Sequence, residues 1–137
     1  MISTKGRYAL SVMIDIAEQN KDSYIPLKDI ADRQKISKKY LEIIVKKLVD
    51  AKLLTGASGK NGGYKLVKSP SKYTLLEILE TTEGSLSPVS CISTSTNDCA
   101  RKKTCKTLPL WIEYYDLISS FLKKKKLKDL IIKKNKP

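Results

Sequence analysis

Apolar residues recur at helical spacing along the first fifty residues of the chain. Between Thr4 and Gln19 they are three and four positions apart, which predicts an amphipathic helix. After a polar break at 20–23, Pro26 precedes a short predicted helix over 27–34. A longer helix is predicted from the N-cap Ser37 to about residue 52. The residues expected on the inner faces are Ala9, Leu10, Val12, Met13, Ile16, Ala17, Leu27, Ile30, Ala31, Leu41, Ile44, Val45, Leu48 and Val49.

The pattern changes after residue 52. Two short alternating segments, 53–55 and 64–67, lie on either side of the glycine-rich stretch 56–63, which predicts a β-hairpin. A further helix is predicted behind Thr74, because Glu77 three residues later completes a capping box.

The last third of the chain contains a segment without periodicity and then a long helix. The preceding helix is expected to stop at Gly84, and residues 84–107 are rich in Ser and Thr and contain all three cysteines. An apolar stripe from Pro109 to Leu122 predicts the long helix, and a last short helix is expected over 127–131. The basic run 123–126 between them is most simply a solvated face.

The order helix, short helix, turn, helix and hairpin is typical of a winged helix-turn-helix. We therefore predict a mainly α fold with a small β-hairpin wing and a long C-terminal dimerisation helix. The expected division is a DNA-binding domain over 1–83, a cysteine-bearing sensor loop over 84–107, and a dimerisation helix with a basic tail over 108–137. Aromatic residues at helical spacing in the long helix indicate a helix–helix seam, so we expect a homodimer.

Composition and charge support a polyanionic partner. The chain has 137 residues, 41% of them hydrophobic, and a formal net charge of +13. Residues 1–60 carry a net charge of +5, residues 61–100 carry −1, and residues 101–137 carry +9. Such an excess favours nucleic acid or an anionic membrane face. A lysine-rich, AT-biased genome would give the same excess of basic residues on any protein surface, so the net charge alone does not decide between these interpretations.

Several classes of function are excluded by what the sequence lacks. With no histidine there is no Ser-His-Asp or Cys-His catalysis and no His-ligated zinc, and no phosphate-binding loop is present. We therefore do not expect an enzyme. The chain has no apolar run of about 18 residues and no secretory signal in its first residues, so a cytoplasmic protein without a membrane partner is expected.

The candidate DNA-binding residues lie on the third predicted helix and the wing. Ser37, Lys38, Lys39 and Tyr40 form the first turn of that helix and Glu42 follows it. Lysines there can reach phosphates or guanine edges, and a helix N-terminus favours an anion. In the glycine-rich wing tip, Gly59 allows close approach to the sugar–phosphate surface and Lys60 supplies a charge. Taken singly, the lysines also fit solvated residues of a first helical turn, and the glycine-rich segment also fits an ordinary hairpin tip.

Three segments resemble the Rrf-two family of bacterial transcription regulators, which includes the iron–sulfur cluster regulator and the cysteine-metabolism repressor. They are STKGRYAL at 3–10, residues 36–42, and the GGYKL-containing segment 59–66, and the resemblance covers about residues 1–122. It implies a homodimer that pairs through the long C-terminal helix and reads a pseudo-palindromic operator in double-stranded DNA. By position, Ser37–Lys39 and Glu42 correspond to base-contacting residues, and Ser58–Lys60 to the part of the wing that enters the minor groove. Family members often have arginine where this chain has Ser58, which weakens readout of a narrow minor groove.

Cys91, Cys99 and Cys105 are the candidate cofactor and metal ligands. Their spacing fits no zinc pattern. The family resemblance implies that they bind an iron–sulfur cluster, [2Fe–2S] or [4Fe–4S]. Such centres usually take four protein ligands, and Leu108 occupies the position of the family's histidine ligand. The fourth ligand would then be Asp98, a residue of the partner subunit, a small thiol or water.

The sequence leaves three functional hypotheses. The first is a sequence-specific repressor whose DNA occupancy responds to an iron–sulfur cluster or to thiol redox state. The second is a cluster-free repressor controlled by a partner protein or a metabolite, with three inert thiols in the loop. The third is a nonspecific architectural DNA-binding protein.

Overall fold

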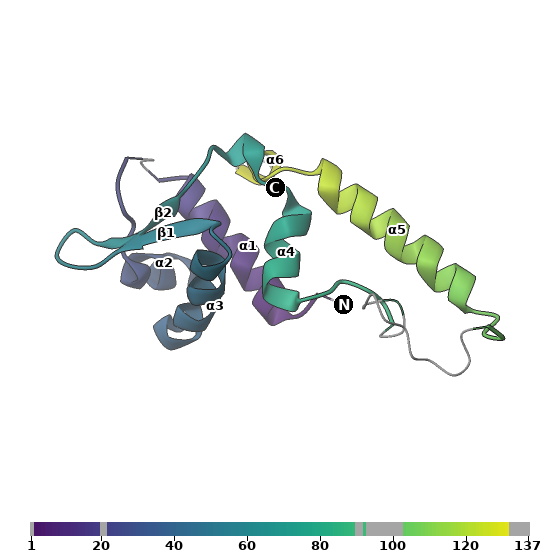
Figure 1. Ribbon diagram of the computed structural model, residues 1–137. Coiled ribbons are helices and arrows are strands. Elements are labelled where there is room, and N and C mark those ends of the chain that lie inside the picture. Colours follow the sequence, from purple (N-terminus) through teal and green to yellow (C-terminus); the bar gives the residue numbers. More distant parts are fainter. Residues whose placement is uncertain (1, 20–21, 90–91, 93–102, 132–137) are drawn as a thin grey trace.

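The computed structural model describes residues 2–19, 22–89, 92 and 103–131. Its elements follow the order predicted from the sequence (Figure 1). They are α1 (Thr4–Ala17), α2 (Leu27–Gln34), α3 (Lys38–Asp50), β1 (Leu54–Ala57), β2 (Gly63–Leu66), the 3-10 turn η1 (Pro70–Lys72), α4 (Leu75–Glu83), α5 (Leu108–Lys124) and α6 (Leu127–Ile131). The predicted mainly α fold, with a hairpin wing and a long C-terminal helix, is confirmed.

Three helices begin at side-chain caps. The Ser3 hydroxyl accepts a hydrogen bond from a backbone N–H in the first turn of α1, and Ser37 accepts one from the Tyr40 N–H at 3.1 Å. At the start of α4, the Thr74 hydroxyl accepts from the Glu77 N–H at 3.1 Å, and the Glu77 carboxylate accepts from the Thr74 N–H at 3.0 Å. These bonds satisfy N–H groups that have no partner inside the helix. The predicted cap at Ser37 and the predicted capping box are confirmed.

The hydrophobic core lies between α1, α2, α3 and α4. Most of the expected inner-face residues are buried, but Leu10, Ala17 and Val49 are only partly buried, because they lie at the margins of their helical stripes. The largest fully buried side chains are Tyr73, Met13, Ile30, Leu41, Ile44, Leu48, Leu54, Ile78, Leu79, Leu86, Leu127 and Val12.

The wing is an antiparallel hairpin fixed to the loop before α2. Leu54 of β1 lies opposite Leu66 of β2. Ile25 and Tyr64 exchange two backbone hydrogen bonds of 2.8 and 2.9 Å, so the base of the wing is joined to the helix-turn-helix. Gly63 makes this approach possible: its φ is +140°, and a Cβ there would collide with the backbone of Ile25.

A buried ion pair joins α1 to α2. The Asp15 side chain is 2% exposed, and one of its oxygens lies 2.7 Å from Arg33 Nη2. Arg33 Nε donates at 3.0 Å and Gln34 Nε2 at 2.9 Å to the other oxygen. The hydrogen bond to Asp15 raises the pKa of Arg33 above its ordinary value, although desolvation acts in the opposite direction. α2 ends at Gln34, and the capping residue Lys35, with a left-handed φ of 57°, turns the chain towards α3.

The C-terminal helices first leave the segment 1–83 and then return to it. α5 runs along the outside of the molecule, and α6 lies beside η1 at the top of Figure 1. The Leu75 N–H donates to the Lys125 carbonyl at 2.9 Å, and the Leu127 N–H donates to the Tyr73 carbonyl at 3.0 Å. Leu127 is fully buried in the same core as α1–α4. Part of the segment 108–137 therefore completes the core of the segment 1–83.

Candidate nucleic-acid interface

The first turn of α3 is exposed and held in a defined position. Ser37, Lys38 and Lys39 are exposed, while Tyr40 is half-buried. The Tyr40 ring packs edge-to-face on Tyr8 with the ring centroids 5.5 Å apart. Tyr40 therefore anchors the start of α3 to α1, and the two lysines project from the anchored turn.

The second group of predicted residues occupies the tip of the wing. Ser58, Gly59 and Lys60 are all exposed. The tip is closed by a hydrogen bond of 3.1 Å from the Gly62 N–H to the Gly59 carbonyl, and Gly59 has a φ of +100°. A Cβ at Gly59 would meet nothing within 4 Å, so the backbone there is open to a large ligand.

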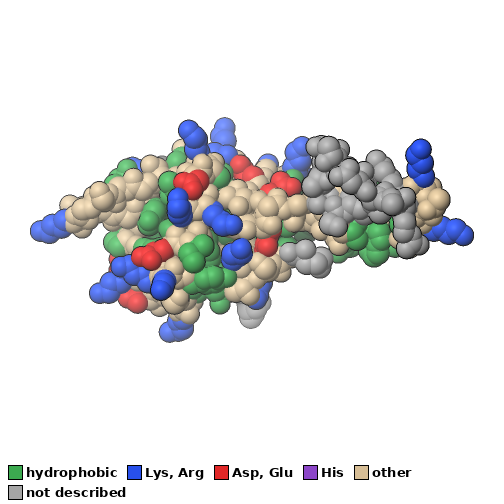
Figure 2. Space-filling model, turned by 60° about the horizontal axis from the view of Figure 1, so that its bottom comes forward, with side chains coloured by type: hydrophobic (Ala, Val, Ile, Leu, Met, Phe, Trp, Pro, Cys, Tyr) green, Lys and Arg blue, Asp and Glu red, His purple; other side chains and the backbone are tan. Residues whose placement is uncertain are grey.

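One hollow joins the helix start to the wing. It has a volume of about 460 Å³ and is lined by Lys38 together with Ser58 and Gly59. Glu42 is exposed on α3 and Lys60 lies at the wing tip, and neither lines this hollow. Figure 2 shows Lys and Arg side chains spread over the half of the molecule that carries α2, α3 and the wing, and the tip of the wing ends in a basic side chain.

Sequence reasoning missed one basic residue of this surface. Lys28, in the first turn of α2, lines the same hollow as Lys38. In helix-turn-helix proteins the first helix of the motif crosses the DNA backbone. The available signal was its position directly after Pro26 and Leu27, at the start of the predicted short helix.

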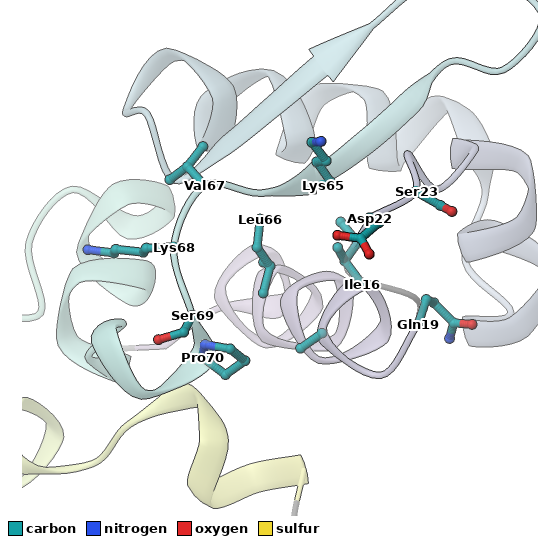
Figure 3. Close-up of a pocket in the computed structure, with 11 residues that line it drawn as sticks. Ile16, Gln19, Asp22, Ser23, Lys65, Leu66, Val67, Lys68, Ser69 and Pro70 are labelled. Carbon is teal, nitrogen blue, oxygen red and sulfur yellow. The ribbon is translucent and has the colours of Figure 1, made fainter.

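A second hollow, of about 500 Å³, lies between the end of α1 and the segment that follows β2 (Figure 3). The amino groups of Lys65 and Lys68 point away from it (Figure 3). Lys65 Nζ lies 4.6 Å from the ring centroid of Tyr24, and Lys68 Nζ lies 4.8 Å from that of Tyr73. Because both amino groups point away from the hollow and lie over aromatic rings, neither is placed to bind a phosphate inside it.

The cysteines fall mostly outside the described residues. Cys91 and Cys99 do so, while Cys105 is half-buried with its Sγ 3.3 Å from Thr107 Oγ1. Leu108, the position of the absent histidine, begins α5. Within the described ranges, no group of three or more His, Cys, Asp or Glu residues could hold a metal ion.

The apolar stripe of α5 is exposed in the single chain. Leu117 is 69% exposed, Phe121 is 58% exposed, and Leu110 is 54% exposed, while no α5 residue is buried. α5 has 17 residues, and no helix in the described part of the chain is long and apolar enough to cross a bilayer. A contiguous apolar face of this kind marks a contact surface.

Comparisons with known proteins agree with this geometry. A model of the Rrf2 family, described as an iron-dependent transcriptional regulator, matches residues 2–133. The HTH-type transcriptional regulator IscR of Vibrio atlanticus is 36% identical over 121 residues, which is 88% of this chain and 69% of that protein. The IscR of Photorhabdus laumondii is 32% identical over 130 residues, 95% of this chain and 78% of that protein.

Solved structures give the same result. The global cysteine regulator CymR of B. subtilis has a TM-score of 0.78 and 34% identity and covers 98% of both chains. T. potens IscR has a TM-score of 0.72 and 28% identity and covers 96% of this chain and 86% of its own. The chain therefore belongs to the Rrf2 family and is a DNA-binding transcriptional regulator, not an enzyme.

Proposed function

We propose that this protein is a homodimeric repressor that reads a pseudo-palindromic operator in double-stranded DNA in the cytoplasm. The observation that carries the proposal is the hollow shared by Lys38 at the start of α3 and by the wing tip. A helix that begins beside a protruding hairpin can enter the major groove while the wing contacts the neighbouring backbone. Ser37, Lys39 and Glu42 face bases or phosphates in this arrangement.

A binding titration at two salt concentrations tests this interface. Lys38→Ala or Lys39→Ala should weaken operator binding by about 1–3 kcal/mol if the lysine contacts a base. Lys60→Ala should lower affinity for all sequences alike and reduce the salt dependence, because it contacts phosphate. Lys128→Ala, which removes an exposed lysine of α6, is the charge-matched control. Unchanged affinity for all three interface variants would remove this surface from the proposal.

The second part of the proposal concerns the group that controls DNA binding, an iron–sulfur cluster. The three thiols of Cys91, Cys99 and Cys105 supply three of the four ligands that a [2Fe–2S] or [4Fe–4S] cluster usually takes. Leu108 carries no donor atom, so the fourth ligand must be Asp98, a residue of the partner subunit, a small thiol or water. Cys91, Cys99 and Cys105 would hold such a cluster, and the cluster would supply redox sensitivity. A ligand that prefers one conformation shifts DNA occupancy by its differential affinity.

A cluster-free repressor, controlled by a partner protein or a metabolite, is the second candidate. It is favoured by the incomplete donor set and by the similarity over 98% of the chain to CymR, which is described as a global cysteine regulator. A nonspecific architectural protein would instead bind operator and random DNA almost equally at fixed salt.

Protein purified without oxygen separates these candidates. The cluster predicts brown protein with bound iron and sulfide, bleached by each single Cys→Ala change. Leu108→His should then make the colour persist longer in air. The cluster-free candidate predicts colourless protein and full operator binding by the triple Cys→Ala variant. Colourless protein without iron after attempted reconstitution would reject the cluster and leave the DNA-binding assignment intact.

A further inference from the structure

One exposed apolar residue interrupts the charged outer face of α3. The side chains of Leu41, Ile44, Val45 and Leu48 are buried in the core, whereas Ile43 is 51% exposed. At 100° per residue Ile43 projects roughly opposite to the buried face. The other exposed residues of α3, a helix that the structure describes completely, are all charged: Lys38, Lys39, Glu42, Lys46, Lys47 and Asp50.

Ile43 contributes little to the folded domain. It is absent both from the buried core and from the partly buried residues packed against it. A β-branched side chain also has a lower helix propensity than Ala, Lys or Glu. Neither packing nor helix formation therefore accounts for isoleucine at this position.

The position of Ile43 on α3 points to DNA. It lies one turn after Lys39, about 6 Å further along the helix axis, and on the same outer face. If Lys39 reaches the major groove, Ile43 enters the groove beside it. The one apolar group that base pairs present in the major groove is the C5-methyl of thymine, and an aliphatic side chain distinguishes it by direct contact.

We propose that Ile43 is a specificity-determining residue that contacts the C5-methyl group of a thymine in each half-site of the operator. This inference rests on the proposed DNA interface and adds to it which base is recognised. Any contact of the neighbouring lysines with phosphate supplies affinity that is independent of sequence. The methyl contact supplies discrimination of thymine from cytosine and from uracil at one position.

Replacing thymine by deoxyuridine tests the contact, because it removes the methyl group and leaves base pairing intact. The operator is first identified by selecting, from a randomised double-stranded DNA library, the sequences that bind the whole protein prepared without oxygen. Each thymine of the selected duplex is then replaced in turn. Wild-type affinity should fall about fourfold per half-site at one symmetric position, as expected for burial of one methyl-sized group, and change little elsewhere.

Ile43→Ala should bind the thymine operator more weakly and lose sensitivity to uracil at that position. Its thermal midpoint should be no lower than that of the wild type, because the side chain is exposed and alanine favours helix. Val67→Ala, which truncates another exposed aliphatic residue, 47% exposed after β2, is the matched control and should keep the uracil sensitivity.

The outcomes separate this inference from the proposed function. A selected consensus without thymine in the half-site, no effect of uracil at any position, or equal uracil sensitivity in Ile43→Ala and wild type would each overturn the role of Ile43. If Lys39→Ala nevertheless weakens binding, the α3 interface stands. If Lys38→Ala, Lys39→Ala and Lys60→Ala bind like wild type, the interface itself is wrong.

Discussion

Arg33→Ala should destabilise the domain more than its surface position suggests. The Arg33 side chain is 41% exposed, but its partner Asp15 is 2% exposed. Three hydrogen bonds reach the Asp15 carboxylate from Arg33, at 2.7, 3.0 and 3.3 Å, and one more comes from Gln34 at 2.9 Å. After the substitution the Asp15 carboxylate keeps the hydrogen bond from Gln34 and loses the three from Arg33.

The size of the effect follows from the buried charge. Breaking a buried ion pair by removing one partner costs about 3–5 kcal/mol. Because Gln34 still donates and water can enter the space that the guanidinium leaves, we expect the lower end, about 3 kcal/mol. Asp15→Ala should cost less, since Arg33 can turn into water. The double variant should be more stable than the sum of the two single effects implies.

Urea denaturation followed by far-ultraviolet circular dichroism measures these differences. Lys46→Ala is the control, because its ion pair with Asp50 is 3.4 Å long and both side chains are well exposed, 76% and 66%. Removal of that pair should cost less than about 1 kcal/mol. The argument fails if Arg33→Ala lowers the free energy of unfolding no more than Lys46→Ala does.

Three further predictions concern the proposed interface between subunits, a buried phenol and a residue with a left-handed φ. Leu117→Glu should shift the sedimenting species from dimer to monomer and abolish operator binding, whereas Lys123→Glu, off the apolar stripe, should not. Tyr73→Phe should lower the free energy of unfolding by about 1–3 kcal/mol, because the hydroxyl donates to the Leu53 carbonyl at 2.7 Å. Burial raises the pKa of Tyr73 above 10.0, so wild-type stability should fall as the pH rises above that value, and less so in the phenylalanine variant. Lys35→Gly should raise the thermal midpoint, since glycine adopts its left-handed φ without strain; a lower midpoint would contradict this.

Local signals were readable from the sequence because their atoms lie within one helical turn. The Ser37 cap and the Thr74–Glu77 capping box each connect residues three positions apart, and both are present as predicted. The sequence predicts that the third helix runs to about residue 52, whereas α3 ends at Asp50, because Lys52 adopts a left-handed φ of 63° that helix propensity does not indicate.

Features that depend on distant residues could not be predicted in this way. The Asp15–Arg33 pair joins residues 18 positions apart, and no periodicity marks two charges as partners. Lys28 lines the same hollow as Lys38 and the wing residues Ser58 and Gly59, which are far from it in the sequence, so its position gives no such signal by itself. The sequence pattern leaves Ile43 off the predicted inner face of its helix, and the structure shows that its side chain is 51% exposed. Periodicity cannot indicate what such an exposed side chain contacts, because its partner is not part of the helix.

The burial of Leu127 also affects how the protein is made. Its contacts with the helices of the DNA-binding domain link chain positions more than a hundred residues apart, so the domain's core closes late in synthesis. Long-range contacts of this kind slow folding, because the loop between them must close before they are gained. A nascent chain that has not yet emerged beyond residue 127 lacks the last piece of that core. The core that supports α3 and the wing is therefore complete only after residues 84–107 and α5 have been synthesised.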